Sequence, residues 1–239
     1  MTTLCIDIGI RNLSMCIMNS SYEILLWEVY NVLDTDEFYC QEKCKNGNIC
    51  GKKCKRKCPN DIFTCEKHFP KEIEKATSNE FKKKNINEYP LQEIAKAFIQ
   101  RVNDIYNKNE IIFKGLTSIH IELQPALNPK MKLISHILYG KFVEFYKDSP
   151  ITIKFVRASQ KLKAYTGPEI KCELKGKYAQ RKWLSIKYCE WILENKFCQE
   201  QKDKWLPIFK SHSKADDLSD TFLYAMNAIS GVPKKSKTN

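Results

Sequence analysis

The chain has 239 residues, of which 43% are hydrophobic, and its 40 lysines and arginines against 28 acidic residues give a formal net charge of +12. This composition excludes a disordered polar tail, and we find neither the roughly 20 apolar residues of a membrane span nor a signal peptide, so we expect a soluble protein of a reducing intracellular compartment. The positive charge is typical of nucleic-acid-binding proteins, with a merely basic surface as the alternative.

The N-terminal segment predicts an antiparallel meander of three strands joined by short turns. Its strands are LCIDIGI, LSMCIMN and EILLWEVYNVL. Asp7 interrupts the first apolar run, and a carboxylate in a buried strand is costly unless it is paired or binds a metal ion. Gly9 favours a metal or phosphate site, because a missing side chain permits close approach to the backbone. Capping a turn or pairing with Arg11 is the structural alternative for Asp7.

Residues 40–68 are too polar for an apolar core, yet they contain six cysteines and one histidine. Clustered cysteines in a chain without a secretion signal are typical of metal ligands, and a tetrahedral zinc site would order this segment. The ligands that we expect are Cys44, Cys50, Cys65 and His68. The alternates are Cys40, Cys54 and Cys58. A thiol-rich disordered loop is the competing interpretation, and the eight lysines and arginines of the segment suit contacts with phosphates.

The middle of the chain predicts a long amphipathic helix from about Tyr89, then a strand, a helix and a second strand. The strand LTSIHIELQP contains an isolated acid, Glu122, and a helix over 131–146 separates it from the strand ITIKFV. Strand, helix and strand in this order indicate a parallel crossover unit. Glu122 should therefore lie at an edge of a mixed sheet.

Residues 157–187 alternate basic side chains with Tyr165, Tyr178 and Trp183. Such a pattern suits the DNA backbone and exposed bases, and the alternative is a solvated loop leading into an amphipathic helix whose aromatic residues pack inward. The basic residues that we expect to bind DNA are Lys161, Lys163, Arg181 and Lys182. The chain has no phosphate-binding or dinucleotide-binding glycine motif, which leaves a nucleotidase or a dinucleotide enzyme unsupported.

Residues 214–229 predict a buried helix whose first turns contain three aspartates. Asp217 and Asp220 are three residues apart and face the same side, whereas Asp216 completes a capping-box pattern with Ser213. Together with Asp7 and Glu122, the two aspartates make four acids from three separate elements, which can converge only if they share cations. Hard oxygen ligands in this number suit two Mg²⁺ or Mn²⁺ ions and phosphodiester hydrolysis.

Four of these segments resemble the ribonuclease H-like Holliday-junction resolvases of poxviruses and other large DNA viruses, which are related to bacterial RuvC and the fungal mitochondrial resolvases. They are IDIGIRNLS, IHIELQ, YAQRKW and KADDLSD, and they cover most of the chain in the right order. The Cys/His-rich insertion is a departure, because poxviral members lack so large a module.

The resemblance implies that Asp7, Glu122, Asp217 and Asp220 coordinate two divalent ions. It also implies that Lys214 contacts a phosphate or the transition state and that Gln124 orients the substrate or the adjacent acid. The implied enzyme is a homodimer that nicks opposing strands of a four-way DNA junction during viral recombination or processing of replication intermediates. Its location would be the infected-cell cytoplasm or nucleus, at sites of viral DNA replication.

We therefore expect an α/β fold with a ribonuclease H-like mixed five-stranded sheet flanked by helices. The nuclease domain should span residues 1–37 and 71–233, with a zinc-knuckle-like insertion at 38–70 and a basic tail at 234–239. Two other interpretations remain open. One is an RNA/DNA-hybrid nuclease on the same fold, and the other is a non-catalytic, zinc-stabilised nucleic-acid-binding protein.

Overall fold

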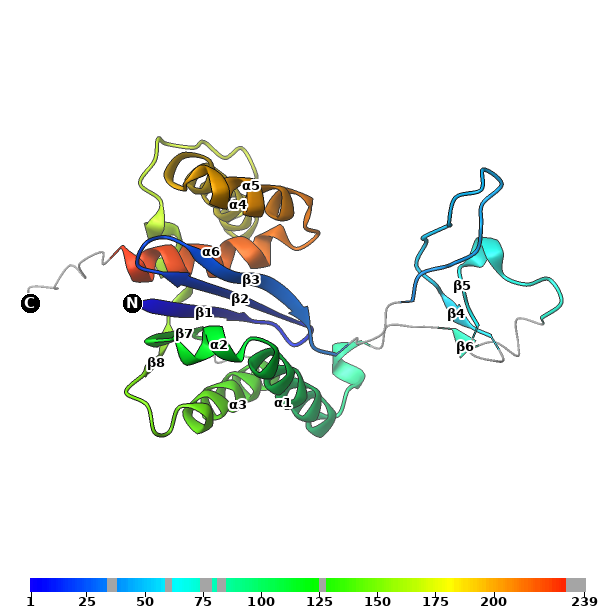
Figure 1. Ribbon diagram of the computed structural model, residues 1–239, viewed down its shortest axis with the longest axis horizontal. Helices are drawn as coiled ribbons and strands as arrows, with labels where there is room; N and C mark the ends of the chain where they lie inside the picture. The colour runs from blue at the N-terminus through cyan, green and yellow to red at the C-terminus, as the bar shows by residue number, and fades with distance from the viewer. Residues whose placement is uncertain (34–37, 59–61, 74–78, 81–84, 125–127, 231–239) are drawn as a thin grey trace, which may run out of the picture. The chain divides into compact units, whose positions relative to one another are not determined.

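The computed structural model describes residues 1–33, 38–58, 62–73, 79–80, 85–124 and 128–230, with side chains for all of these except residues 79–80. The chain forms two compact units, the first made of Met1–Val32 with Leu91–Asn239 and the second of Leu33–Pro90 (Figure 1). The second unit has wider bounds than the 38–70 insertion expected from the sequence, and the tail at 234–239 lies outside the described residues. No helix within the described ranges is long and apolar enough to span a lipid bilayer.

The first unit is built on a mixed five-stranded sheet with the order β3-β2-β1-β7-β8. Its strands are β1 (Thr2–Ile8), β2 (Asn12–Asn19), β3 (Ile24–Asn31), β7 (Ser118–Glu122) and β8 (Thr152–Val156). The first three pair antiparallel, as the short turns between them require, and β7 and β8 continue the sheet in parallel with β1. The ribonuclease H-like sheet flanked by helices that the sequence predicted is thus confirmed.

Helices cover both faces of this sheet (Figure 1). On one face lie α1 (Leu91–Lys108), α2 (Glu110–Lys114) and α3 (Pro129–Phe145), and on the other lie the 3₁₀ segment η5 (Ala158–Ala164), α4 (Lys177–Lys196), α5 (Gln199–Ser211) and α6 (Ala215–Ile229). The helix expected over 131–146 begins at Pro129, because the Asn128 side chain accepts a hydrogen bond from Met131 N at 3.1 Å and proline suits the first turn.

One apolar cluster lies between the sheet and α4, α5 and α6, and it contains Trp27 of β3. The Trp27 ring lies 5.4 Å from the Phe209 ring and 5.3 Å from the Phe222 ring, measured between centroids. The indole Nε1 donates to Leu218 O at 2.9 Å, so the buried polar atom of this ring is satisfied. These contacts hold α6 firmly on the sheet, and its aspartate-bearing first turns are positioned with it.

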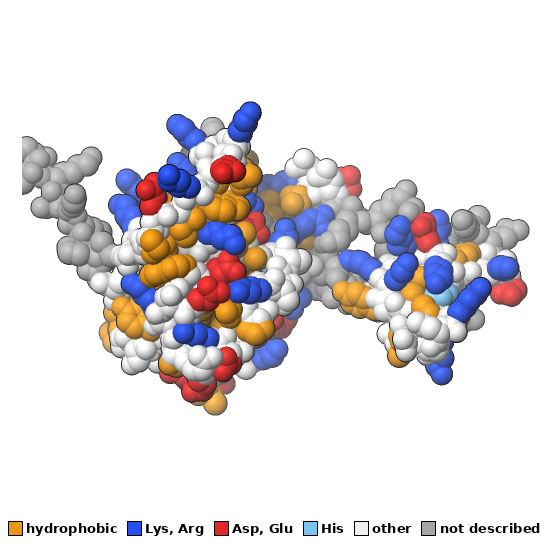
Figure 2. Space-filling view, turned by 90° about the horizontal axis from the view of Figure 1, so that it is seen from above, with side chains coloured by type: hydrophobic (Ala, Val, Ile, Leu, Met, Phe, Trp, Pro, Cys, Tyr) orange, Lys and Arg blue, Asp and Glu red, His pale blue; other side chains and the backbone are white. Residues whose placement is uncertain are grey.

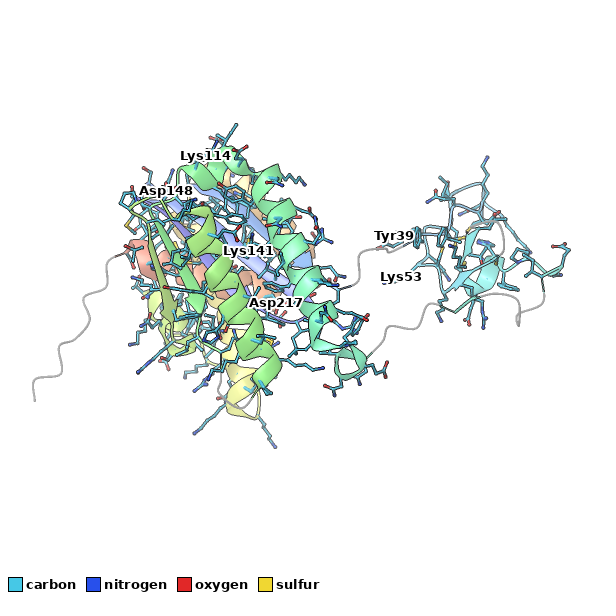
Figure 3. The ribbon with its side chains drawn as sticks, turned by 90° about the horizontal axis from the view of Figure 1, so that it is seen from below. Tyr39, Lys53, Lys114, Lys141, Asp148 and Asp217 are labelled. Carbon is cyan, nitrogen blue, oxygen red and sulfur yellow. The ribbon has the colours of Figure 1, made fainter. Side chains whose placement is uncertain are left out.

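The second unit has little regular structure among its described residues. A small sheet has the strand order β5 (Phe63–Thr64), β4 (Arg56–Lys57), β6 (Asn79–Glu80), and a 3₁₀ turn, η2, spans Glu66–His68. An isolated bridge joins Tyr39 and Lys53, both labelled in Figure 3. Buried Cys40, Cys54 and Cys65 form its core, with the stacked rings of Phe38 and Phe63 against them, and lysine and arginine side chains project around its surface (Figure 2).

Candidate active site

Two neighbouring strands and one helix bring the four acids expected from the sequence to one pocket. In the parallel pair of β1 and β7, Ile6 is opposite Ile121, so Asp7 and Glu122 follow at the ends of adjacent strands. On the same face, Ser14 of β2 donates to Asp217 O at 2.9 Å, which places the first turns of α6 beside them. The pocket has a volume of about 570 Å³, and Asp7, Glu122, Asp217 and Asp220 all line it. The labelled Asp217 lies in the first unit in Figure 3.

The surroundings of Asp7 disfavour its ionisation. Burial of its carboxyl, followed by the negative charges of Glu122 and Asp220, raises the pKa of Asp7 well above its ordinary value, and a hydrogen bond with Glu122 adds to the effect. Carboxyl groups that share a small buried volume cannot all be ionised without a compensating cation. This is the electrostatic condition that a divalent metal ion relieves.

Asp217 lies in a similar environment at the first turn of α6. Burial, followed by the charge of Asp216, raises the pKa of Asp217. The charges of Lys214 and Lys182 partly offset this rise, and Asn12 adds to the offset, because its Nδ2 donates to Asp217 Oδ2 at 3.4 Å. Gly9 lies in the turn between β1 and Asn12 and is required for a different reason than expected. A Cβ at Gly9 would lie 2.7 Å from Asn12 O, which accepts a hydrogen bond from the Gly9 N–H.

Lys161 of η5 is one of the cations that line the pocket, and it forms an ion pair with Asp220. The two side chains are only 15% and 14% exposed, so the pair is far less screened by solvent than a surface ion pair. Burial lowers the pKa of Lys161, but the charges of Asp220 and Glu122 outweigh burial and raise it. The sequence placed Lys161 among the DNA-binding residues and did not connect it with the acids.

Two neutral side chains that the sequence analysis did not single out orient the carboxylates. Tyr224, four residues after Asp220 on α6, donates its hydroxyl proton to Glu122 Oε2 at 2.8 Å. Ser185 of α4 donates to Asp220 Oδ1 at 2.5 Å. Tyr224 lies in the helix that the sequence predicts to be buried, whereas Ser185 lies in the basic segment, where the sequence carried no signal for it.

Lys214 and Asp216 differ from the expectation. Lys214 is an exposed residue at the N-cap of α6, and it is not among the described residues that line the pocket. The capping box expected between Ser213 and Asp216 does not form, because α6 begins after Lys214 and has no side-chain cap. Asp216 instead forms an ion pair with Lys182 of α4.

The other predicted DNA-binding residues are divided between the pocket and its surroundings. Arg181 and Lys182 line the pocket, while Lys163 is exposed and does not. Gln124 also lies outside the lining, and its Nε2 lies 3.5 Å from Glu122 O, the backbone carbonyl of the acid it was expected to orient.

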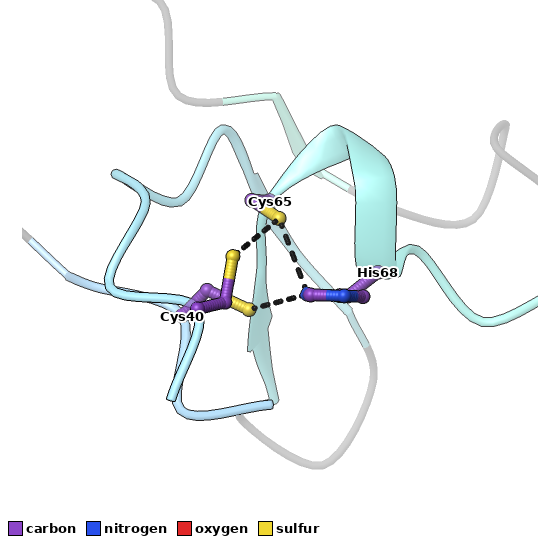
Figure 4. A group of neighbouring side chains, drawn as sticks. Cys40, Cys65 and His68 are labelled. Carbon is purple, nitrogen blue, oxygen red and sulfur yellow. Dashed lines mark hydrogen bonds between the residues drawn. The ribbon is translucent and has the colours of Figure 1, made fainter. Parts of the chain in front are cut away.

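A separate metal-ligand group lies in the second unit and contains Cys40, Cys50, Cys65 and His68 (Figure 4). The Cys50 and Cys65 sulfurs are 3.8 Å apart, and His68 Nδ1 lies 3.4 Å from Cys40 Sγ and 3.7 Å from Cys65 Sγ. A tetrahedral Zn²⁺ ion with bonds of about 2.3 Å to sulfur and about 2.0 Å to nitrogen requires separations of roughly 3.8 Å and 3.6 Å. The donor set and its spacing therefore fit zinc, and all three cysteines are free thiols.

This group differs from the four predicted zinc ligands at one position, since it contains Cys40, which was named as an alternate, and not Cys44. Cys44 is held in a turn, where its carbonyl accepts from Gly47 N at 2.9 Å and its N–H donates to Asn48 O at 2.8 Å. Cys40 lies at the base of the same loop, where its N–H donates to Lys52 O at 2.8 Å and Gly51 N donates to its carbonyl at 3.0 Å. Cys40 was named as an alternate because spacing alone does not distinguish the two.

Comparisons with known proteins found neither a matching family model nor a matching curated protein. Similar solved structures include the Fowlpox virus resolvase in complex with substrate Holliday junction DNA, at 14% identity over 98% of this chain and 100% of that chain, with a TM-score of 0.49. They also include T. thermophilus RuvC in complex with a Holliday junction substrate, at 12% identity over 97% of each chain, with a TM-score of 0.44. Both belong to the group that the sequence motifs resemble. Because these TM-scores lie below 0.5, we base the function on the site itself.

Proposed function

We propose that this protein is a structure-selective endodeoxyribonuclease that resolves four-way DNA junctions by metal-assisted phosphodiester hydrolysis. The observation that carries the proposal is the meeting of Asp7, Glu122, Asp217 and Asp220, from three separate elements, in one pocket with basic walls. A buried cluster of acids is costly for folding alone, and its chemistry suits hard divalent cations.

The four acids would hold two Mg²⁺ or Mn²⁺ ions, which when bound supply Lewis acidity toward the scissile phosphate. Tyr224 and Ser185 orient two of the ligands, Glu122 and Asp220, through direct hydrogen bonds. Lys161 and Arg181 bring positive charge to the same pocket, where the phosphate gains negative charge during cleavage. Lys214, which the resemblance assigned to this role, lies outside the pocket lining and is a less favourable candidate.

Zn²⁺ bound by Cys40, Cys50, Cys65 and His68 is the structural metal of the proposal. A structural zinc site supplies roughly 10 kcal/mol or more toward folding, which suits a unit whose described core is largely cysteine. The family resemblance further supports a homodimer with two sites that nick opposing strands, acting in viral recombination or replication-intermediate processing in the infected-cell cytoplasm or nucleus.

The test is cleavage of a labelled immobile four-way junction beside a linear duplex and an RNA/DNA hybrid, with Mg²⁺ or with Ca²⁺ in its place. Chelation is avoided because it would also remove zinc. We expect paired, Mg²⁺-dependent nicks in the junction that disappear in Asp7→Asn while junction binding persists. Asp148→Asn, an exposed acid with an 87% exposed side chain, is the matched control and should cut normally.

Two results would contradict the proposal. Preferred cutting of the hybrid would indicate an RNA/DNA-hybrid nuclease on the same fold. Binding without cleavage in Mg²⁺ or Mn²⁺ would indicate a zinc-stabilised nucleic-acid-binding protein whose acids are structural.

A further inference from the structure

One aromatic ring lies on the wall of the carboxylate pocket and is not used in folding. Tyr178, in the first turn of α4, is 73% exposed, although it lines the pocket together with Asp7 and Glu122. Among the described residues that line the pocket it is the single aromatic one. A large exposed ring beside a strongly charged pocket is a poor contribution to stability and is a typical feature of a binding surface.

The other aromatic residues of the basic segment are placed differently. Tyr165 stacks on Tyr188 with ring centroids 3.8 Å apart and an interplanar angle of 1°, and Trp191 packs against its edge at 5.3 Å. Trp183 is partly buried and is not among the described lining residues. The structure thus separates a packed aromatic, Tyr165, from an available one, Tyr178, which the sequence pattern could not do.

The ring of Tyr178 is tied to the helix that carries two of the acids. Lys182, one turn further along α4, forms an ion pair with Asp216 of α6, and its Nζ lies 5.3 Å from the Tyr178 ring centroid. The pKa of Lys182 is raised, chiefly by its hydrogen bond to Asp216 and further by the neighbouring Tyr178. The Lys182 ammonium therefore connects the Tyr178 ring with Asp216, which directly precedes Asp217 in the first turn of α6.

We propose that Tyr178 is a stacking platform for a nucleobase exposed beside the scissile phosphate, and that the Asp216–Lys182 pair positions it. The inference rests on the proposed function and names the feature of the substrate that the pocket selects. In a continuous duplex both faces of every base are covered by neighbouring bases, so the ring finds no partner. At a branch point a base face is available, and stacking on it would favour branched DNA over linear duplex.

The experiment compares Tyr178→Ala and Tyr178→Phe with the wild type on a four-way junction that contains 2-aminopurine at the branch point. Stacking of a base on an aromatic residue corresponds to a roughly 5- to 150-fold effect. We expect Tyr178→Ala to lose about tenfold or more in kcat/KM for the junction and in affinity with Ca²⁺, and Tyr178→Phe to stay within about threefold of the wild type. The fluorescence change of 2-aminopurine on binding in Ca²⁺ should persist in the phenylalanine variant and disappear in the alanine variant. Tyr22→Asn is the control, because this 38% exposed tyrosine lies in a hairpin turn at φ 61°, a conformation that asparagine tolerates.

The positioning role of Asp216 is tested by a double-mutant cycle. Asp216→Asn should lower junction affinity in Ca²⁺ when Tyr178 is present and change it little in the Tyr178→Ala background. Equal effects of Asp216→Asn in both backgrounds would show that it acts on its neighbour Asp217 and would overturn this role. Equal fluorescence and affinity for Tyr178→Ala and the wild type would overturn the stacking proposal. Failure of the wild type to cut any DNA in Mg²⁺ would instead contradict the proposed function. The binding measurements in Ca²⁺ do not depend on cleavage, so they test the stacking proposal separately.

Discussion

At the scale of single residues, the hydrogen bond from Tyr224 to Glu122 links the apolar core to the acids. Tyr224 is 2% exposed, and burial followed by the charge of Glu122 raises its pKa, so the hydroxyl keeps its proton and donates it. A neutral donor of this kind fixes the rotamer of a carboxylate ligand and does not neutralise its negative charge, which stays available to a metal ion.

Tyr224→Phe should therefore change the Mg²⁺ dependence of cleavage more than the stability of the fold. We expect a loss of about 1 kcal/mol in the free energy of unfolding and an increase of about tenfold in the Mg²⁺ concentration for half-maximal cleavage. Tyr146→Phe is the matched control, since it removes a buried hydrogen bond of 2.7 Å to Phe113 O on the other side of the sheet. An equal shift of the Mg²⁺ curve in both variants would show that the effect is not specific to Glu122.

The positions of Lys161 and Lys163 give a second prediction at this scale. Both lie on η5, but Lys161 pairs with Asp220 in the pocket whereas Lys163 is exposed. Lys161→Gln should lower the single-turnover cleavage rate at saturating Mg²⁺ by about 10²-fold, because it removes a cation from the site where charge develops. Lys163→Gln should stay within about threefold, and equal losses in the two variants would assign both lysines to general DNA binding.

At the scale of secondary-structure elements, a salt-bridge network fastens α4 to α5. Glu190 of α4 accepts from Lys187 at 2.9 Å and from Lys210 of α5 at 3.4 Å, and its side chain is 23% exposed. The hydrogen bond from Lys187 is the main reason that the pKa of Glu190 is lowered. A carboxyl whose pKa is lower in the folded state than in the unfolded state stabilises the fold above its unfolded pKa of about 4.3.

This stabilisation should be lost as the pH falls through the lowered pKa of Glu190. Glu190→Gln should reduce the free energy of unfolding by roughly 0.5–1 kcal/mol at pH 7, and the difference from the wild type should shrink toward pH 3. Urea unfolding at the two pH values measures both. Glu200→Gln, an exposed acid on α5, should cause no such pH-dependent difference.

The loop between Cys40 and Cys50 is the second element whose chemistry can be tested directly. We expect about one Zn²⁺ ion per chain in the wild type and in Cys44→Ser, and much less in Cys40→Ser, when metal content is measured after gel filtration. Cys40→Ser and Cys44→Ser replace the same side chain at positions four residues apart, so each is a control for the other. Loss of zinc from Cys44→Ser with retention in Cys40→Ser would restore the ligand set expected from the sequence.

At the scale of the whole molecule, the chain consists of two units with different sources of stability. The first has a large apolar core, whereas the described core of the second is three buried cysteines with two aromatic neighbours, Phe38 and Phe63. The second unit interrupts the first in sequence, between β3 and α1. Units with separate cores are expected to unfold separately.

Calorimetry should therefore record two thermal transitions. Chelation of zinc, or the substitution Cys40→Ser, should abolish the transition of the second unit and leave that of the first nearly unchanged. A single transition that moves as a whole on chelation would mean that the two units fold as one cooperative body.

The sequence by itself predicted the five strands of the larger sheet, most helices and the four acids that line the pocket. An isolated acid in an apolar run, such as Asp7 or Glu122, is informative because the cost of burying a charge does not depend on knowing the fold. The 3.6-residue period likewise places Asp217 and Asp220 on one side of a helix before any contact is known. These are local properties, and they were sufficient for the fold class and the acidic part of the site.

The tertiary structure decided which of several similar side chains meet. Lys161 rather than Lys214 enters the pocket, Cys40 rather than Cys44 joins the zinc group, and Tyr178 rather than Tyr165 remains available. The two residues of each pair are of the same type, and each lies in or beside a segment with a predicted role, so composition and spacing do not decide between them. Contacts in the pocket join residues far apart in the chain, such as Tyr224 and Glu122, and they depend on how helices pack on the sheet. Packing is a property of the assembled core, which no single segment contains.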